Sequence, residues 1–212
     1  MVIAEPVLAS APTRGEVTAA RILDVAEALF ARRGYEGTTL RDVAAGVGLR
    51  TPSLYNHFAG KDALYAAVLE RGVAPVLSAL SEFARDGSGD PEALVVAVMD
   101  LLAAHPDLPR LIQHEILSGG ERLMPLLGDS IGPVFARAHE VAEASPGAGA
   151  WSAEEIPLLV LAMYHVVVGY FTIAPLYAEL QGQDLLTQPA IERQTRFLGE
   201  LVSVLFSGTT KE

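Results

Sequence analysis

Residues 38–61 read TTLRDVAAGVGLRTPSLYNHFAGK, and this stretch predicts two short helices joined by a tight turn. Its first half places apolar residues at the i, i+3, i+4, i+7 spacing of one helical face: Leu40, Val43, Ala44 and Val47. Thr39 precedes that face and Asp42 follows three residues later, which is the pattern of a capping box. Gly46 and Gly48 then supply residues that can take a positive φ where the helix ends.

A second helix start follows directly in the sequence. Thr51 can cap this helix, and Pro52 suits its first position because no N–H is needed there. Leu54 and Phe58 lie four residues apart on the face expected to point inward. The polar residues of the segment are left on its other faces: Ser53, Tyr55, Asn56 and His57.

Two short helices joined by a glycine turn form a helix-turn-helix, whose second helix lies in the major groove of DNA. The side chains fit that role, since Ser, Asn and Arg can bond base edges while Tyr, His, Thr and Lys can bond phosphates. An ordinary αα-hairpin with polar residues facing water has the same spacing. Spacing alone therefore leaves both interpretations open.

Motifs of a known family occur here in order and without a gap: Arg21-Ile22-Leu23, Ala26, Leu29-Phe30, Gly34-Tyr35, Thr38-Thr39, Val43-Ala44, Gly46-Val47, Leu54-Tyr55-Asn56-His57-Phe58 and Lys61-Asp62-Ala63-Leu64. Together, residues 17–69 resemble the amino-terminal domain of the tetracycline-repressor (TetR) family of dimeric, ligand-released transcriptional repressors. The chain departs from the family at Arg50, where Ser or another small capping residue is usual. The cap is therefore expected at Thr51.

The resemblance implies an all-α fold, with an amino-terminal three-helix helix-turn-helix domain and a carboxy-terminal helical domain for ligand binding and dimerisation. We expect a disordered tail over residues 1–12, the DNA-binding domain over 13–60 and the second domain over 61–212. The residues expected to contact double-stranded operator DNA are Thr39, Arg41, Arg50, Thr51, Ser53, Tyr55, Asn56, His57 and Lys61. Among them, Lys61 and Tyr55 most resemble the family's phosphate ligands.

Charge is divided unequally along the 212 residues, whose net charge is −11. Residues 1–72 contain eight Lys or Arg and eight Asp or Glu, whereas residues 73–212 contain seven and eighteen. A neutral DNA-binding part predicts weak nonspecific binding to phosphate. The absence of cysteine excludes disulfides and thiol catalysis and is compatible with the cytosol, so a cytoplasmic protein is expected.

The rest of the chain predicts helices throughout, and no stretch alternates convincingly as a strand. Three start signals are clear: capping boxes at Thr13 with Glu16 and at Ser152 with Glu155, and a cap at Asp90 followed by Pro91. We expect a short helix over 107–118, a helix over 123–144 that Pro125 and Pro133 break or bend, a flexible loop over 145–150, and two final helices ending near 180 and 206. Gly72 and Pro75 are expected to weaken or kink the fourth helix.

No pattern of catalytic or metal-binding residues is evident, so neither a cofactor nor a metal is expected. The histidines of the second part show no i, i+4 pair: His105, His114, His139 and His165. His114 and Glu115 are adjacent and do not face each other on a helix, which argues against an acid–base pair. The alternative to a repressor is a helical enzyme or carrier in which the helix-turn-helix is scaffold. DNA retention would distinguish the two.

Residues 156–178 contain no charged side chain, and their length permits a membrane span. Acidic flanks without a basic anchor argue against a span, and a helix apolar on all sides can equally be buried in a soluble core. We expect this helix to form a homodimer interface with residues of the last helix: Ile191, Leu198, Leu201, Val202 and Leu205. No membrane partner is expected.

A small-molecule effector is expected to bind in the second part, between helices from Leu94 to Val168. His114 and Tyr164 are the polar residues expected to orient it. The acidic body favours a neutral or cationic lipophilic ligand. Ligand is expected to shift the helix around residues 64–75, which continues directly from the DNA-binding part.

Overall fold

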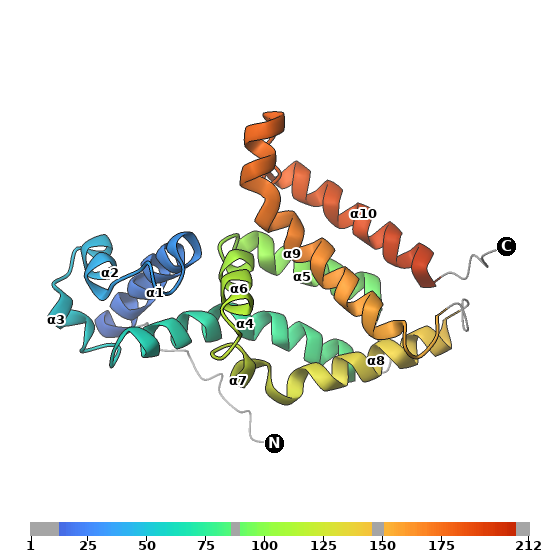
Figure 1. Ribbon diagram of the computed structural model, residues 1–212, viewed down its shortest axis with the longest axis horizontal. Helices are drawn as coiled ribbons and strands as arrows, with labels where there is room; N and C mark the ends of the chain where they lie inside the picture. The colour runs from blue at the N-terminus through green and yellow to red at the C-terminus, as the bar shows by residue number, and fades with distance from the viewer. Residues whose placement is uncertain (1–12, 86–89, 146–150, 207–212) are drawn as a thin grey trace, which may run out of the picture. The chain divides into compact units, whose positions relative to one another are not determined.

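The computed structural model describes residues 13–85, 90–145 and 151–206, and every regular element in those ranges is a helix (Figure 1). The all-α prediction is therefore confirmed for the described residues. The chain forms two compact units, which divide in the sequence between Val68 and Leu69. The tail expected over 1–12 and most of the loop expected over 145–150 lie outside the described residues.

The first unit contains α1 (Arg14–Arg33), α2 (Leu40–Val47), α3 (Thr51–Leu54) and the first two turns of α4 (Lys61–Arg85). Their apolar faces meet in one small core, as the spacing in the sequence predicts. The buried side chains of this core are Ile22, Ala26, Leu29, Phe30, Val43, Ala44, Val47, Leu54, Leu64, Tyr65 and Val68. The domain boundary expected after residue 60 stays a prediction.

Both capping boxes of the first unit form as predicted. The Thr13 hydroxyl accepts the Glu16 amide and the Glu16 carboxylate accepts the Thr13 amide, and Thr39 and Asp42 make the same pair of bonds. At α3 the prediction is wrong. Arg50 occupies the N-cap position in an extended conformation without a side-chain cap.

The second unit holds the remainder of α4 and seven further helical segments: α5 (Pro91–Ala104), α6 (Leu108–Leu117), α7 (Met124–Leu127), the 3-10 turn η1 (Gly128–Ser130), α8 (Ile131–Ala144), α9 (Ile156–Gln181) and α10 (Gln188–Phe206). The helix expected over 123–144 is broken, as one of the two alternatives predicted, but the break lies at Gly128, whose φ is +36°, and not at Pro125 or Pro133. Asp90 caps α5 as predicted, through a bond from the Glu92 amide.

The capping box expected at the start of α9 needs revision, whereas a weakened or kinked α4 stays a prediction. One bond of the expected capping box forms, because the Ser152 amide donates to the Glu155 carboxylate at 2.8 Å. Ser152 is not the N-cap residue, however: Glu155 occupies that position in a helical conformation, without a side-chain cap. Helix α4 continues through Pro75 to Arg85 and is a single element. Because proline has no N–H, the carbonyl of Arg71 receives no helical hydrogen bond from position 75.

The core of the second unit is formed chiefly where α5 and α10 lie side by side, with α9 packed on α6 and α8. Met99 and Leu102 of α5 and Leu198 of α10 are almost completely buried there. Helix α9 is different, because apolar side chains on several of its turns are exposed: Leu158, Leu161, Val166, Ile173, Leu176, Tyr177 and Leu180. Helices α4 and α9 are each long and apolar enough to cross a membrane. Core helices of soluble proteins meet the same two criteria of length and composition.

Candidate nucleic-acid interface

Helix α2 is held at both ends by contacts within the first unit. Gly48 ends it in the left-handed conformation, with φ +75° and ψ +27°. The Arg21 guanidinium of α1 donates to the Val47 carbonyl at 3.4 Å, where the last carbonyls of α2 lack helical partners. Gly46, the next-to-last residue of α2, lies so close to α1 that an added Cβ would stand 2.5 Å from Cγ1 of Val25. The position of α2 on α1 is therefore closely fixed.

Helix α3 is short and continues as a turn. After Leu54, the amides of Asn56, His57 and Phe58 donate to the carbonyls of Ser53 and Leu54, so the helical path extends beyond the four residues of α3. Leu54 is 1% exposed and anchors this segment to the core. The two elements and their turn have the connectivity of a helix-turn-helix.

The structure places all nine residues expected to bind DNA in the first unit, on α2, on the α3 segment or at the start of α4. Five of them are exposed: Thr39, Arg41, Arg50, Tyr55 and Asn56. Thr51, Ser53, His57 and Lys61 are partly exposed. All nine are thus accessible to a ligand, and their contact with DNA stays a prediction.

Lys61 begins α4 and lies against an aromatic side chain from the loop after α1. Its Nζ is 4.0 Å from the centroid of the Tyr35 ring. The Tyr35 hydroxyl donates to Oδ1 of Asp62 at 2.6 Å. No local sequence pattern predicts this contact, because it joins residues 26 positions apart.

Two more polar residues of the first unit have structural roles. Thr38 is completely buried, and its hydroxyl lies within hydrogen-bonding distance of the Leu29 and Gly34 carbonyls. Asp42 accepts bonds from Thr39, and these bonds hold the pKa of its carboxyl below the ordinary value. Arg33 lies 3.8 Å from the same carboxylate and has the same, weaker effect on that pKa.

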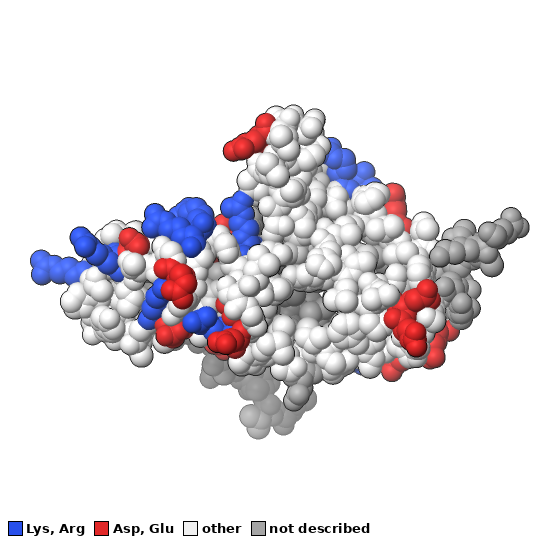
Figure 2. Space-filling view, in the orientation of Figure 1, with Lys and Arg blue, Asp and Glu red and all other residues white. Residues whose placement is uncertain are grey.

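Charge differs between the two units. Up to Val68 the chain has seven Lys or Arg and seven Asp or Glu, and from Leu69 onward it has eight and nineteen. Figure 2 shows Lys and Arg side chains gathered over the amino-terminal helices, with acidic side chains among them, whereas the visible surface of α9 is largely uncharged. The whole net charge of −11 thus belongs to the second unit.

The residues expected to orient an effector differ in their surroundings. His114 is exposed on α6. Tyr164 of α9 is half-buried, burial raises the pKa of its phenol, and its buried hydroxyl has no hydrogen-bond partner among the described residues. Glu115, which follows His114 in the sequence, is buried, and its carboxylate accepts a hydrogen bond from the Arg122 amide at 2.8 Å.

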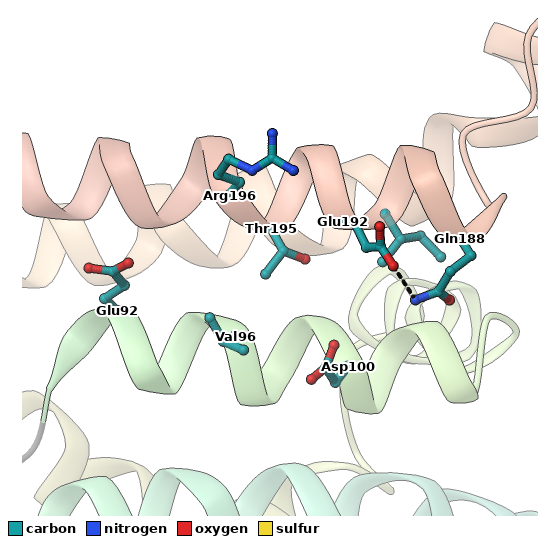
Figure 3. Close-up of a pocket in the computed structure, with 8 residues that line it drawn as sticks. Glu92, Val96, Asp100, Gln188, Glu192, Thr195 and Arg196 are labelled. Carbon is teal, nitrogen blue, oxygen red and sulfur yellow. Dashed lines mark hydrogen bonds between the residues drawn. The ribbon is translucent and has the colours of Figure 1, made fainter.

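A groove of about 240 Å³ lies between α5 and α10 (Figure 3). Val96 and Ile191 give it apolar walls, and its polar residues come from both helices: Glu92, Asp100, Gln188, Glu192, Thr195 and Arg196. Gln188 and Glu192 are hydrogen-bonded to each other at 3.1 Å. Neither His114 nor Tyr164 lines this groove, so their role in a pocket stays a prediction.

Of the five residues expected at a dimer interface, three are already buried within the single chain. Ile191, Leu198 and Val202 are 6%, 0% and 4% exposed, whereas Leu201 and Leu205 are partly exposed. The exposed apolar side chains of α10 are Phe197 and Val204. Ile191, Leu198 and Val202 thus pack within the single chain, and the part that the five residues play in a dimer interface stays a prediction.

Sequence comparison connects the first unit to known regulators. Residues 22–68 match the family described as "Bacterial regulatory proteins, tetR family". The transcriptional repressor KstR2 of Mycobacterium tuberculosis is 35% identical over 97 residues, which are 43% of this chain and 48% of that protein. The repressor SCO4008 of Streptomyces coelicolor is 31% identical over 110 residues, 52% of this chain and 55% of that protein. The chain thus matches about half the length of these curated relatives.

Structural comparison extends over nearly the whole chain. The solved structure of KstR2 from Mycobacterium tuberculosis has a TM-score of 0.70 at 18% identity and covers 96% of this chain and 98% of its own. The regulator PfmR of Thermus thermophilus has a TM-score of 0.64 at 16% identity, covering 95% and 100%. At such identities the likeness establishes the fold, and it includes the helical second unit.

Proposed function

We propose that this chain is a regulator of the tetR family of bacterial regulatory proteins, which residues 22–68 match. It represses transcription as a homodimer bound to an inverted-repeat operator, and a small-molecule effector releases it. The observation that supports the proposal most directly is the helix-turn-helix of α2 and α3, which carries accessible residues able to bond bases and phosphates.

The alternative of an enzyme or carrier gains no support. The relatives described above are named as transcriptional repressors and regulators, and the tetR family consists of regulators and not of enzymes. Regulators of this family are typically cytoplasmic, and we place this protein in the cytoplasm as well.

Selection from a pool of random-sequence DNA duplexes tests DNA binding without knowledge of the operator. A two-fold dimer presents two recognition elements, so the selected site is expected to be an inverted repeat with half-sites on one side of the DNA. Failure to enrich any sequence would contradict the proposal. Enrichment of a single half-site would contradict its dimeric form.

Variants at Lys61 and Asn56 separate the two kinds of DNA contact. Lys61→Ala removes one proposed phosphate contact, so affinity for every duplex should fall and the salt slope should decrease by about one. Asn56→Ala, with Arg50→Ala as a second variant, should alter which bases are selected. A Lys61→Ala protein that changed base preference and kept the slope would show this assignment to be wrong.

We propose that α9 and α10 form the dimer interface with the same helices of a second copy. Supporting observations are the apolar side chains that α9 exposes along its length, including Ile173 and Leu176, which are 46% and 50% exposed. Phe197, 55% exposed, extends this surface to α10. An interface of four such helices is expected to be obligate and mostly apolar.

Sedimentation of the purified protein tests the interface. A dimer is expected at micromolar concentration, and Leu176→Glu should yield monomers because it places a charge in an apolar interface. Glu179→Gln is the matched control on the same helix and should remain dimeric. A wild-type monomer would contradict the interface, and recovery in the membrane fraction would favour the span that the length of α9 allows.

We propose a neutral or cationic lipophilic effector that binds within the second unit. Support comes from Tyr164, whose buried hydroxyl has no partner among the described residues and could donate to a ligand. Two structural relatives are described as a ketosteroid regulator and a fatty acid degradation regulator, which suggests ligands of lipid type. Such a ligand would use its polar group for the Tyr164 hydroxyl and its apolar part for helix contacts.

Linked titrations test effector release once a ligand has been found. Operator must weaken ligand binding by the same factor by which ligand weakens operator binding. Equal ligand affinity with and without operator would contradict this mechanism. Tyr164→Phe should retain operator affinity and lose ligand response, whereas Tyr170→Phe, which loses its bond to the Leu185 carbonyl, serves as the control.

A further inference from the structure

The contact between Lys61 and Tyr35 places a flexible cation on a rigid support. The ammonium lies 4.0 Å from the centroid of the ring, a distance at which the negative face of an aromatic ring attracts a cation. Lys61 is partly exposed, so its charge remains accessible from outside the unit. A lysine side chain otherwise has a long, mobile stem that must lose rotamer freedom when it binds a partner.

The Tyr35 ring is itself fixed by the core. It stacks on Phe30 at a centroid distance of 6.2 Å and meets the edge of Tyr65 at 5.0 Å. Phe30 and Tyr65, 0% and 1% exposed, contact each other at 4.7 Å in an edge-to-face arrangement. The hydroxyl end of the ring is held as well, because it donates to Asp62 at 2.6 Å. The ring thus links the loop after α1 to two consecutive residues of α4.

This arrangement has a direct consequence for phosphate binding. An ammonium has three N–H donors, and a ring beneath it engages one side only, which leaves donors available for phosphate oxygens. Holding the side chain in place before binding reduces the entropy lost on binding. The same contact also stabilises a positive charge at the start of a helix, where the helix dipole disfavours it.

We propose that Tyr35 is a positioning residue for DNA binding, which holds the Lys61 ammonium ready for the phosphate backbone. The inference rests on the proposed function, because it requires Lys61 to contact DNA. Tyr35 itself acts through Lys61. The experiment must separate this role from two alternatives for the ring: stabilising the fold only, and sequestering Lys61 from DNA.

A double-mutant cycle distinguishes these roles. Affinity for the selected duplex is measured over a range of salt concentrations for Tyr35→Leu and Lys61→Ala, singly and together. A cation–π contact of ordinary strength predicts that Tyr35→Leu weakens binding about two- to five-fold when Lys61 is present. In the Lys61→Ala protein the same change should have no effect beyond error, since the group it positions is gone.

Two further variants serve as controls. Tyr35→Phe keeps the ring face and loses the hydroxyl that donates to Asp62, so it should retain most of the affinity that Tyr35→Leu loses. Tyr55→Leu alters another exposed tyrosine of the first unit, and its effect should add to that of Lys61→Ala. In proton NMR, the ring current should shift the side-chain signals of Lys61 in the wild type and Tyr35→Phe, and not in Tyr35→Leu.

The outcomes are separable. Equal losses from Tyr35→Leu in both backgrounds would overturn the inference in favour of a role in folding alone, while the proposed function would stand. Tighter binding by Tyr35→Leu would overturn it in favour of sequestration. A wild-type protein with no salt-dependent binding to any duplex would overturn the proposed function and, with it, the inference.

Discussion

The two units specify their helices in different ways. In the first unit, α1 and α2 each begin with a complete capping box, and α2 ends at a left-handed glycine. In the second unit, α6, α7, α8 and α9 follow residues in helical conformation, and those residues make no side-chain cap. Apart from α3, which has no side-chain cap, and α5, which Asp90 caps, side-chain hydrogen bonds mark helix starts in the first unit, whereas packing between helices has the larger part in the second.

The two units also differ in how completely a single chain buries its apolar residues. The first unit exposes only two large apolar side chains among those described, Val17 and Tyr55. The second exposes a series of them along α9 and α10. The proposed dimer would cover this surface, so we expect changes there to have effects that vary with protein concentration.

The largest expected effect tests this dependence with two neighbours on α10. Leu198→Ala removes a side chain that is 0% exposed and should lower the free energy of unfolding by about 2–5 kcal/mol at any protein concentration. Phe197→Ala alters an exposed residue, so its loss should be visible mainly in denaturation midpoints that vary with concentration. Equal behaviour of the two variants in chemical denaturation at two concentrations would contradict the assignment of the two faces.

Next in size is a change at the contact between α1 and α2. Gly46→Ala places a Cβ 2.5 Å from Cγ1 of Val25, a stiff β-branched side chain, and should cost about 1–3 kcal/mol of stability. Gly15→Ala is the matched control, because its new Cβ has no neighbour closer than 3.8 Å and alanine favours helix. Thermal denaturation of both variants gives the comparison, and a neutral Gly46→Ala would show that α2 can move on α1.

A smaller effect concerns the local signals themselves. Thr39→Ala removes the capping hydroxyl of α2 and should lower the free energy of unfolding by about 1 kcal/mol. Arg50→Ala changes the equivalent position of α3, where no side chain caps, and should leave stability nearly unchanged. Urea denaturation distinguishes them, and equal losses would mean that the capping box adds little.

The smallest effect is a pH dependence of the two capping carboxylates. Hydrogen bonds from Thr13 and Thr39 lower the pKa of Glu16 and Asp42 below the ordinary values of 4.5 and 3.8. A lowered folded-state pKa means that the stabilisation is present above the ordinary pKa and is lost as pH falls through the lowered value. Denaturation between neutral and acidic pH should show a weaker loss in Thr39→Ala than in wild type. An identical acid profile would contradict the assignment.

The sequence predicted most of the first unit because its signals are local. Thr13 with Glu16, Thr39 with Asp42, and the glycine at position 48 act on residues within one turn, and each forms as expected. The prediction that Thr51 caps α3 was wrong. The geometry of the turn places Arg50 at the N-cap position and overrides the preference of threonine for that position. The contact of Tyr35 with Lys61 joins distant residues and leaves no periodic pattern.

The second unit was less predictable for a different reason. Residues such as Leu198 and Phe197 are both apolar, and composition does not tell which face of α10 meets α5. For the same reason, the expected dimer residues included Ile191 and Val202, which lie in the core. The break expected at Pro125 or Pro133 lies at Gly128 instead, because both prolines occupy the first turn of a helix, where a missing N–H costs little.

The unequal charge of the two units bears on how such a protein would search a chromosome. Proteins find their sites by sliding and hopping along nonspecific duplex, and the time spent there grows with the number of phosphate contacts. With no net positive charge up to Val68 and −11 beyond it, residence on nonspecific DNA would be brief. Most copies would then travel through the solvent between encounters. After the effector is withdrawn, the time needed to reoccupy an operator would depend mainly on the number of repressor molecules in the cell. Repressor molecules already bound to nonspecific chromosomal DNA would contribute less.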